Sequence, residues 1–513
     1  MFDEILYSIS KVAQVSVRHI GEYSKGKYRS LYGKDVVLKI SHYYNYSQEY
    51  NVYNDENINC KTLLHVLYEI KCHKWTLTVT SSKVAWRVPG RYMVILHGEG
   101  DVHRNIRKLR TTAARRGHQV EVLRTFFFFS GALRGFLVKM SSDVIQLALK
   151  LPHVQYVEED SFIFAQSAPW SLHKDLHERH FGGTGEKTTY TPPNDGGMME
   201  VYLMDGSIRA SHRELKGRVV ATDFNEIPEE DEVKASRCSA HSTHVASVVS
   251  GTDSGVARGA GIHLVRVLNC HGKGSVSGAL AGLEYIRSTV NRSPVVVLLP
   301  FVGAFSRSLN VASRKLVASG AVVVAAAGNY KDDACFYSPA SEPEVITVGA
   351  VDVSNRRVAL GSGGTNFGRC VNLFAPGDDI ISASSECDTC FTARSGTSQA
   401  AAHVAGIAAL ILSSNRKASP LQVLHAMLRY STSRIIDVRA LMGRHRLNTP
   451  NAMAAMQHTV NNMTSKQDFN QYFGFECRVS EPRLLSSCPP GWTRTQWRPE
   501  GWGDTVCCRG RRV

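Results

Sequence analysis

A serine followed by a run of small residues is the feature of this sequence that most directly suggests chemistry. Ser398 lies in the stretch 395–406, S-G-T-S-Q-A-A-A-H-V-A-G, which is typical of a helix start packed closely against its neighbours. Backbone N–H groups at a helix N-terminus lack intrahelical partners, so they can bind the oxyanion of an acyl-transfer reaction beside a serine nucleophile. The stretch alone fits an N-capping serine on a buried helix equally well.

Two further segments supply the other side chains that serine catalysis needs. Asp205 ends the apolar run 201–205, a pattern typical of a buried parallel strand whose carboxyl end carries functional groups. His241 lies among small residues shortly before the apolar run 245–249. Alone, such an aspartate is often a helix cap and such a histidine is often structural. The chain order Asp205, His241, Ser398 is one of the orders known for the Ser-His-Asp triad, and it predicts a serine protease.

An amide side chain at the end of another apolar segment completes this set. The run 322–327 is typical of a buried strand and continues into Gly328 and Asn329. A Gly-Asn pair also fits an ordinary turn. Next to the triad, however, the amide of Asn329 can donate a hydrogen bond to the developing oxyanion, and we interpret it in that role.

With these residues the chain resembles the subtilases, and in particular their proteinase K-like branch. The resemblance extends from about residue 86 to about residue 455. Besides the residues above, it rests on the stretches 266–270, 337–341, 343–349 and 364–370. It implies an α/β fold, a subtilisin-like parallel sheet flanked by helices, over residues 167–448. It also implies a serine endopeptidase that requires no cofactor. Structural calcium occurs in the family, but Asn372 stands where a carboxylate would be expected, so no metal ligands are assigned.

Four positions near the candidate catalytic residues depart from the family pattern. Ser242 and Ser247 replace glycines, and Gly206-Ser207 follows Asp205 where subtilases have Ser/Thr-Gly. Glycine beside a catalytic residue allows close backbone approach, which an added Cβ can hinder. We therefore expect a weakened protease whose activity is limited to an autocatalytic cut.

The segment 86–166, in front of the catalytic region, has a helix and strand pattern of its own. It predicts strands at 92–96, 136–140 and 155–158 and helices at 101–116 and 142–151. This alternation suggests a small ferredoxin-like α/β domain. The resemblance implies an inhibitory propeptide that its own catalytic domain cuts off and that then stays bound. The matching boundary places the cut between Gln166 and Ser167.

Within the branch, the resemblance is to secreted proprotein convertases that bind an epidermal-growth-factor-like repeat of the LDL receptor and direct it to lysosomal degradation, thereby regulating cholesterol uptake. The surface positions that match are Ser167, Arg213, Asp253, Thr389 and Phe391. Phe391 fits both an exposed interface anchor and a buried loop aromatic. The alternative function is that of a general secreted serine protease acting on other proteins.

The cysteines indicate the compartment. Twelve cysteines without a CxxC…CxxC zinc arrangement favour disulfides formed in an oxidising environment. The resemblance implies the pairs Cys238–Cys270, Cys335–Cys370 and Cys387–Cys390. A redox role for the last pair lacks the thioredoxin-like βαβ context that such motifs require. The pairing of Cys60, Cys72, Cys477, Cys488, Cys507 and Cys508 stays open.

The chain is strongly basic, with a formal net charge of +15. It lacks nucleic-acid-binding signatures, so we expect no nucleic-acid partner. One dense cluster lies on the predicted helix 101–116 and comprises Arg104, Arg107, Lys108, Arg110, Arg115 and Arg116. Such a cluster is either a solvated face or a docking site for sulphated glycans such as heparan sulphate.

The two ends of the chain do not follow the resemblance. Residues 1–85 contain no apolar core of a signal peptide, and we interpret them as an atypical N-terminal segment, disordered or derived from a wrongly assigned first exon; a cytosolic variant is the alternative. Residues 449–513 resemble an incomplete cysteine-rich β module. Since 18-residue apolar runs are absent, no membrane span is predicted. The resemblance implies secretion through the endoplasmic reticulum and Golgi, with later passage to the cell surface, endosomes and lysosomes.

Overall fold

The computed structural model describes the side chains of residues 86–98, 100–129, 131, 133–167, 192–227, 238–290, 294–352, 355–358, 363–433, 436 and 448–455. The chain divides into two compact units, 1–187 with 194–456, and 188–193 with 457–513. The predictions for residues 1–85 and for the cysteine-rich module beyond residue 455 fall outside the described side chains. Backbone strands at these ends are β1 Ser16–Val17, β2 Gly21–Ser24, β3 Lys27–Ser30, β4 Val36–His42, β5 Tyr46–Val52, β28 Phe475–Val479, β29 Thr493–Arg494 and β30 Val506–Gly510.

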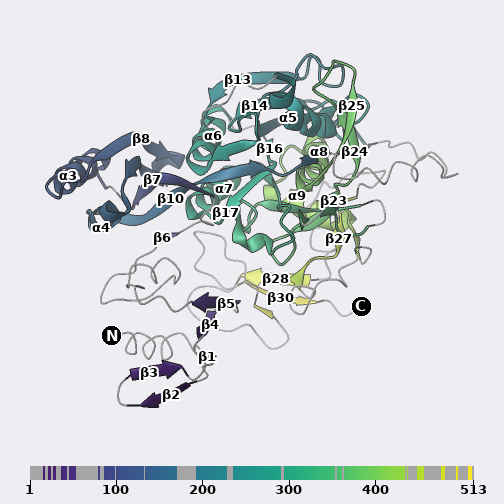
Figure 1. Ribbon diagram of the computed structural model, residues 1–513. Helices are drawn as coiled ribbons and strands as arrows, with labels where there is room; N and C mark the ends of the chain where they lie inside the picture. Colours follow the sequence, from purple (N-terminus) through teal and green to yellow (C-terminus); the bar gives the residue numbers. More distant parts are fainter. Residues whose placement is uncertain are drawn as a thin grey trace. The chain divides into compact units, whose positions relative to one another are not determined.

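A parallel sheet forms the centre of the first unit (Figure 1). Its strands in spatial order are β13 Val219–Asn225, β14 Gly261–Arg266, β12 Glu200–Asp205, β16 Val295–Leu299, β18 Val322–Ala326, β20 Ile346–Val351, β23 Leu373–Pro376, β27 Ala452–Met453 and β26 Thr432–Ser433. All neighbours are parallel except the edge pair β26 and β27. The central strands are continuous apolar runs because helices cover both faces of the sheet.

The helices pack in two groups, one on each face of this sheet. Side chains of α5 (Ala235–Ser250), α8 (Thr397–Ser414) and α9 (Pro420–Tyr430) share one apolar cluster with one face of the strands. Side chains of α6 (Val276–Thr289) and α7 (Arg307–Ala318) share another with the opposite face. This mixed α/β architecture has the subtilisin-like sheet and helices that the sequence predicts. Both α5 and α8 therefore deliver side chains to the same carboxyl edge of the sheet.

The segment 86–166 has the element order β-α-β-β-α-β. Its elements are β7 Arg87–Leu96, α3 Val102–Ala114, β8 Val120–Phe128, β9 Leu133–Met140, α4 Ile145–Leu149 and β10 Val154–Ala165. The strands lie in the order β10-β7-β9-β8, and the two helices pack on one face. Strand β8 is absent from the predicted elements. Its first six residues, V-E-V-L-R-T, mix polar and apolar types at alternating half-buried and exposed positions, and only its last three residues, all phenylalanine, form an apolar run.

Strand β10 joins this segment to the rest of the unit. Beyond the predicted strand 155–158 it continues to Ala165, where it pairs antiparallel with β15 (Lys273–Ser275) and β17 (Phe301–Ala304). In Figure 1 it runs from the edge of the segment toward α8. Short strands β6 Val79–Thr80, β11 Ala168–Pro169, β19 Tyr337–Ser338, β21 Ala359–Leu360, β22 Gly363–Gly364, β24 Ile380–Ala383 and β25 Phe391–Ser395 complete the unit.

Two buried carboxylates of β10 dock against helix starts. Glu158 accepts hydrogen bonds from the backbone N–H of Ser308, 2.9 Å, at the start of α7. Asp160 accepts from the N–H of Ser277, 3.1 Å, at the start of α6, and forms an ion pair with Arg91, 3.0 Å. Both carboxylates complement the positive end of a helix. Burial raises the pKa of each, although these hydrogen bonds and the ion pair act in the opposite direction.

Three disulfides are present among the described residues, at the pairs that the resemblance implies: Cys238–Cys270, Cys335–Cys370 and Cys387–Cys390. The first ties α5 to the loop after β14, and the third closes a short loop before β25. No helix in the described part of the chain combines the length and apolarity that a membrane crossing needs.

Candidate active site

Asp205 and His241 lie in direct contact. Asp205 is the last residue of β12 and is 1% exposed, so its carboxylate points from the end of a central strand into a dry site. One of its oxygens lies 2.7 Å from His241 Nδ1, and the other accepts from the N–H of Gly206, 2.7 Å. His241 stands in the middle of α5, and the apolar run 245–249 forms the last part of the same helix. Its Nε2 atom is buried and has no hydrogen-bond partner among the described residues.

Ser398 is the second residue of α8 and is fully buried beneath the segment 86–166. Its hydroxyl donates to the carbonyl oxygen of Pro300, 2.7 Å, and accepts from the N–H of Gln166, 3.1 Å. A hydrogen bond between Ser398 Oγ and His241 Nε2 is therefore absent in this state. A rotation of the serine side chain is needed before the imidazole can take its proton.

The carbonyl group of Gln166 lies at the start of α8. Its oxygen accepts from the backbone N–H of Ser398, 3.0 Å. Asn329 is oriented by Thr397, whose N–H and hydroxyl both donate to the Asn329 amide oxygen, at 3.0 and 2.9 Å. The amide nitrogen of Asn329 consequently faces away from Thr397. A Cβ placed on Gly396 would lie 2.9 Å from this nitrogen and closer still to the Gln166 oxygen, so both groups converge on one small space.

The chain passes through the site in an extended conformation on both sides of the Gln166–Ser167 bond. Before the bond, the N–H of Ala165 donates to the carbonyl oxygen of Gly272, 2.8 Å. After it, the hydroxyl of Ser167 accepts from the side-chain amide of Gln399, 3.1 Å, and Ala168–Pro169 pairs with β25. The segment therefore lies in the site as a substrate strand would.

Comparison with known proteins gives the family. Residues 198–473 match the subtilase family, which is more than half of the chain. The chain belongs to the subtilase family. It is similar to a cold-adapted subtilisin-like serine proteinase, with 32% identity, a TM-score of 0.46, and coverage of 52% of this chain and 91% of the other. It is also similar in fold to fervidolysin from Fervidobacterium pennivorans, described as a keratinolytic enzyme related to subtilisin, with 17% identity, a TM-score of 0.55, and coverage of 74% and 62%. This subtilase is a serine endopeptidase.

Two further polar side chains lie near Asp205 and His241. His244 lies one helical turn from His241, and its Nε2 contacts the carbonyl oxygens of Ile380 and Thr392, at 2.9 and 3.2 Å. Burial lowers the pKa of His244 to about 3, so this histidine stays neutral and structural. Burial also lowers the pKa of the Arg394 guanidinium, while the Asp205 carboxylate acts against that shift.

The two serines that replace family glycines differ in their surroundings. Ser247 forms a hydrogen bond with Ser254, 2.8 Å between the hydroxyl oxygens. Ser242, next to His241, is fully buried, and its hydroxyl has no hydrogen-bond partner among the described residues. A buried hydroxyl without a partner is destabilising. The position next to His241 is therefore the less well accommodated of the two.

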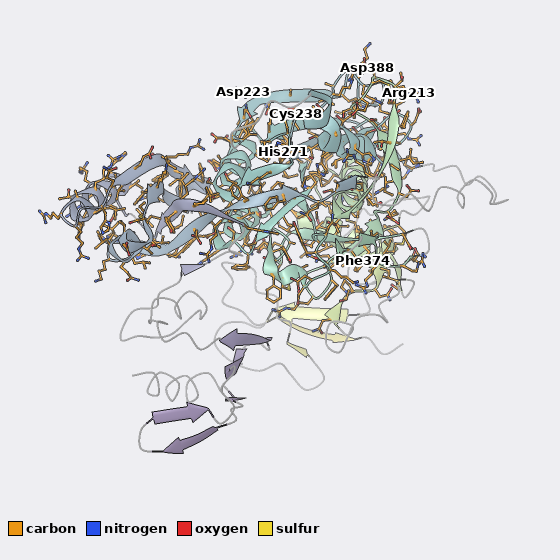
Figure 2. The ribbon with its side chains drawn as sticks, viewed as in Figure 1. Arg213, Asp223, Cys238, His271, Phe374 and Asp388 are labelled. Atoms are coloured by element: carbon orange, nitrogen blue, oxygen red, sulfur yellow. A yellow bond between two sulfur atoms is a disulfide. The ribbon has the colours of Figure 1, made fainter. Side chains whose placement is uncertain are left out.

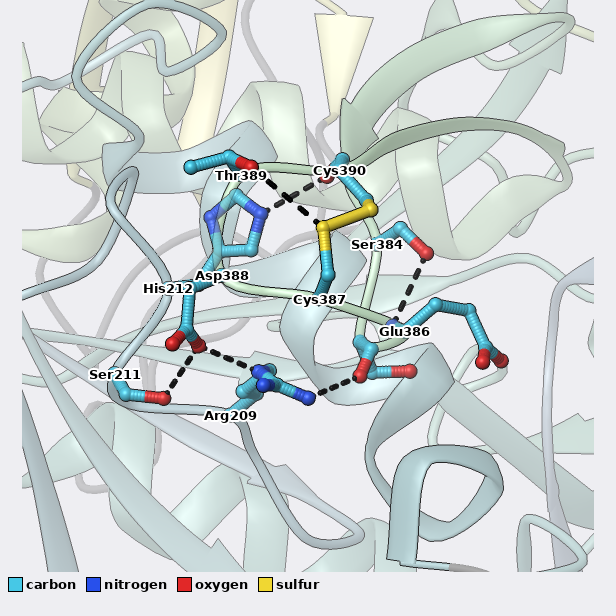
Figure 3. The surroundings of a disulfide bond; sticks show 10 residues. Arg209, Ser211, His212, Ser384, Glu386, Cys387, Asp388, Thr389 and Cys390 are labelled. Atoms are coloured by element: carbon cyan, nitrogen blue, oxygen red, sulfur yellow. Dashed lines mark hydrogen bonds and ion pairs between the residues drawn. A yellow bond between two sulfur atoms is a disulfide. The ribbon is translucent and has the colours of Figure 1, made fainter.

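The positions matched to the receptor surface fall into two places. Arg213 forms an ion pair with Asp253, 2.8 Å, and its guanidinium lies 5.1 Å from the ring centre of Phe391, which is 37% exposed. Thr389 belongs to the Cys387–Cys390 loop, shown in Figure 3. Ser167 lies instead beside Ser398, on the other side of the Gln166 carbonyl.

The disulfide loop is fixed to the neighbouring surface through Asp388. Its carboxylate accepts from Arg209 Nε, 2.6 Å, and from the hydroxyl of Ser211, 2.7 Å (Figure 3). The carbonyl oxygen of Asp388 accepts from the N–H of Arg213, 2.8 Å, and Figure 2 shows these two residues at the same end of the unit. These bonds hold the loop and Phe391 in one rigid surface.

Metal ligands are not gathered in the described part of the chain, where no group of three or more His, Cys, Asp or Glu side chains converges. The side-chain oxygen of Asn372 accepts from the N–H of Thr347, 2.7 Å, so it serves as a backbone acceptor. Structural calcium is common in the subtilase family, and none of the catalytic roles considered for this site requires a metal.

Several contributors to the site carry no sequence-based assignment. Thr397 orients Asn329, Pro300 binds the serine hydroxyl, and Gly396 leaves room for the Gln166 carbonyl group. The Gly-Thr pair directly before Ser398 is the one signal that could have revealed two of them. The carbonyl group of Pro300 acts through the backbone, so its residue type carries no signal.

Proposed function

We propose that residues 86–166 are an inhibitory propeptide, that residues 167–448 are the catalytic domain, and that this subtilase cuts the Gln166–Ser167 bond itself. The observation that carries this proposal is the hydrogen bond, 3.0 Å, from the Ser398 N–H to the Gln166 carbonyl oxygen. A scissile carbonyl oxygen must occupy that position for the oxyanion to be stabilised as it forms.

The catalytic steps follow from the residue types. Ser398 Oγ attacks the Gln166 carbonyl carbon, and His241 Nε2 takes the hydroxyl proton. Asp205 holds His241 through Nδ1 and stabilises the imidazolium. The Ser398 N–H and the Asn329 amide bind the oxyanion. The Gln166–Ser167 C–N bond then breaks, His241 protonates the new amino group of Ser167, and water releases Gln166 as a carboxylate.

The same contacts account for limited activity toward other proteins. Strand β10 pairs with β15 and β17 through residues 162–165, and a cut after Gln166 breaks none of these pairs. We therefore expect the product to stay in the site. An intramolecular substrate has a very high effective concentration, which allows one cut even where Ser242 weakens the site.

The test is the chain composition of purified protein. We expect wild-type protein to appear as two fragments that co-purify, with a new N-terminus at Ser167. Ser398→Ala leaves one uncut chain. Cleavage at Ser167 in Ser398→Ala protein would show that another protease makes the cut.

We further propose that the mature protein acts mainly by binding, as proprotein convertase subtilisin/kexin type 9 does, which the chain resembles over about residues 86–455. That convertase binds the LDL receptor and promotes its lysosomal degradation. The support here is the exposed Phe391 held beside Arg213 and the disulfide loop. Glu386, Thr392 and Ala393 differ from the resembled surface, so the affinity is expected to differ as well.

Binding is measured with a purified epidermal-growth-factor-like repeat of the receptor. Phe391→Ala is expected to weaken it at least about fivefold, which corresponds to about 1 kcal/mol. Ile381→Ala, a substitution of a 60% exposed side chain on the neighbouring strand, is the matched control. Equal binding by Phe391→Ala would remove Phe391 from the contact. Turnover of added peptides without receptor binding would favour the general secreted protease.

Secretion follows from this function and from the three disulfides, which form in oxidising compartments. The basic side chains of α3 are all exposed, and no acidic residue lies within that helix. We assign to this face the binding of sulphated glycans at the cell surface.

A further inference from the structure

The side chain of Gln166 ends among three polar groups rather than in an apolar pocket. Its Oε1 atom accepts from the backbone N–H of Asn329, 2.9 Å. Its Nε2 atom donates to the carbonyl oxygen of Phe164, 2.8 Å, and lies 3.3 Å from the hydroxyl of Tyr330. Gln166 is 2% exposed, so water does not substitute for these partners.

These partners define the orientation of the amide. A backbone N–H can only donate and a backbone carbonyl oxygen can only accept. The oxygen of the Gln166 side chain must therefore face Asn329, and its nitrogen must face Phe164 and Tyr330. A glutamate at this position would direct a carboxylate oxygen at the Phe164 carbonyl oxygen, and a methionine would leave the Asn329 N–H without an acceptor.

Tyr330 is held in place independently of Gln166. Its ring stacks on Tyr337, with ring centres 5.2 Å apart and planes 3° apart, and Trp86 packs 5.1 Å away. The N–H of Tyr330 donates to the side-chain oxygen of Asn366, 3.0 Å. The phenol hydroxyl is thus positioned by contacts that do not involve the Gln166 side chain, which favours a selective contact.

We infer that Tyr330, together with the main-chain N–H of Asn329, selects glutamine as the residue that precedes the cleaved bond. This inference rests on the proposed self-cleavage and names its substrate class: chains with an uncharged amide side chain at that position. It applies equally to any peptide cut in trans. Tyr330 is a specificity-determining residue, because its hydroxyl contacts the substrate side chain and not the reacting atoms.

The first experiment measures the rate of self-cleavage in full-length protein carrying Gln166, Gln166→Met or Gln166→Glu, each with Tyr330 or Tyr330→Phe. We expect Gln166 to be cut faster than both replacements, with glutamate the slowest. Tyr330→Phe should lower the preference for glutamine over methionine by about three- to tenfold, the effect of one neutral hydrogen bond. Tyr430→Phe, at the last residue of α9, is the matched control and should keep the preference.

An unchanged preference in Tyr330→Phe protein, or equal rates for glutamine and methionine, would overturn the inference. A second measurement does not depend on cleavage. In Ser398→Ala protein, we measure the urea midpoint of unfolding for the four chains that combine Gln166 or Gln166→Met with Tyr330 or Tyr330→Phe. The change in midpoint caused by both substitutions together should differ from the sum of the changes caused by each alone. Additive midpoints would contradict the contact itself. Absence of cleavage in wild-type protein would instead contradict the proposed function.

Discussion

Substitution of Gly396 by alanine tests the position of the scissile carbonyl group most directly. Gly396 has a φ of +155° and immediately precedes α8. A Cβ at this position would lie 2.9 Å from Asn329 Nδ2 and 3.0 Å from Ser167 Cα, and nearest of all to the Gln166 carbonyl oxygen. All three groups are fixed by other contacts, so the added methyl group forces the carbonyl group out of the oxyanion site.

The size of the effect follows from these contacts. Real Cβ atoms are essentially never this close to other heavy atoms, so the Gln166 carbonyl group or the Asn329 amide must move. Loss of one oxyanion donor costs about 10²–10³ in rate, and a misplacement of about 1 Å costs about 10². We therefore expect Gly396→Ala to slow self-cleavage at least about 100-fold, which corresponds to about 2.7 kcal/mol.

The assay follows the uncut chain and its fragments in newly synthesised protein by pulse-chase labelling. The control must reproduce the backbone strain of the substitution without the steric clash. Gly320→Ala serves this purpose, because Gly320 also has a positive φ, +102°, but has no heavy atom within 4 Å of an added Cβ. Gly320→Ala should be cut at close to the wild-type rate.

The result that would refute this reasoning is rapid self-cleavage of Gly396→Ala protein, within about threefold of the Gly320→Ala control. Such a result would show that the Gln166 carbonyl group reacts from a different position. The position of the Gln166 carbonyl oxygen in this structure would then no longer support the assignment of Asn329 and the Ser398 N–H as the oxyanion donors.

Two further predictions concern pH and charge. Burial lowers the pKa of His244 from 6.5 to about 3, so the folded state disfavours its protonation. The free energy of unfolding is therefore expected to decrease as the pH falls below the unfolded-state pKa of 6.5, by about 2 kcal/mol at about pH 5. Between neutral pH and pH 5, the free energy of unfolding measured in urea should fall by about 2 kcal/mol less in His244→Gln protein than in wild-type protein. An equal decrease in both proteins would contradict the assignment. Reversing the charges of Arg107, Lys108 and Arg110 on α3 should lower the salt concentration that elutes the protein from heparin; unchanged elution would rule out this face as the glycan site.

Asp205 and Ser398 could be proposed as catalytic residues from sequence because each lies at the end of an element with a simple pattern. The apolar run before Asp205 and the small-residue run after Ser398 correspond to β12 and to α8. His241 was harder to interpret, since α5 contains polar and apolar residues on all sides and the histidine occupies its middle. The chain order of the three residues, rather than any one pattern, carried the prediction.

Other features could not be found in this way because they depend on backbone groups or on tertiary contacts. The first residues of strand β8 mix polar and apolar types, a pattern that is also common in loops. The Pro300 carbonyl oxygen binds the Ser398 hydroxyl through the backbone, so any residue type could supply this contact. No sequence pattern marks Tyr330, the residue after Asn329, as part of the site. Its proximity to Gln166, 164 positions earlier, appears only when β10 pairs with β17.

The orientation of Ser398 suggests why cleavage in this protein would be a single event. Its hydroxyl is bound to the Pro300 carbonyl oxygen and to the Gln166 N–H, whereas the Nε2 atom of His241 has no hydrogen-bond partner within the described part of the chain. The Ser398 hydroxyl must break those two hydrogen bonds before it can contact His241. The bound segment gains no conformational entropy in return, because β10 remains paired with β15 and β17. A substrate in trans would additionally have to displace β10, including the buried contacts of Glu158 and Asp160 with two helix starts. The barrier to a second turnover therefore lies in removing the propeptide rather than in the chemistry at Ser398.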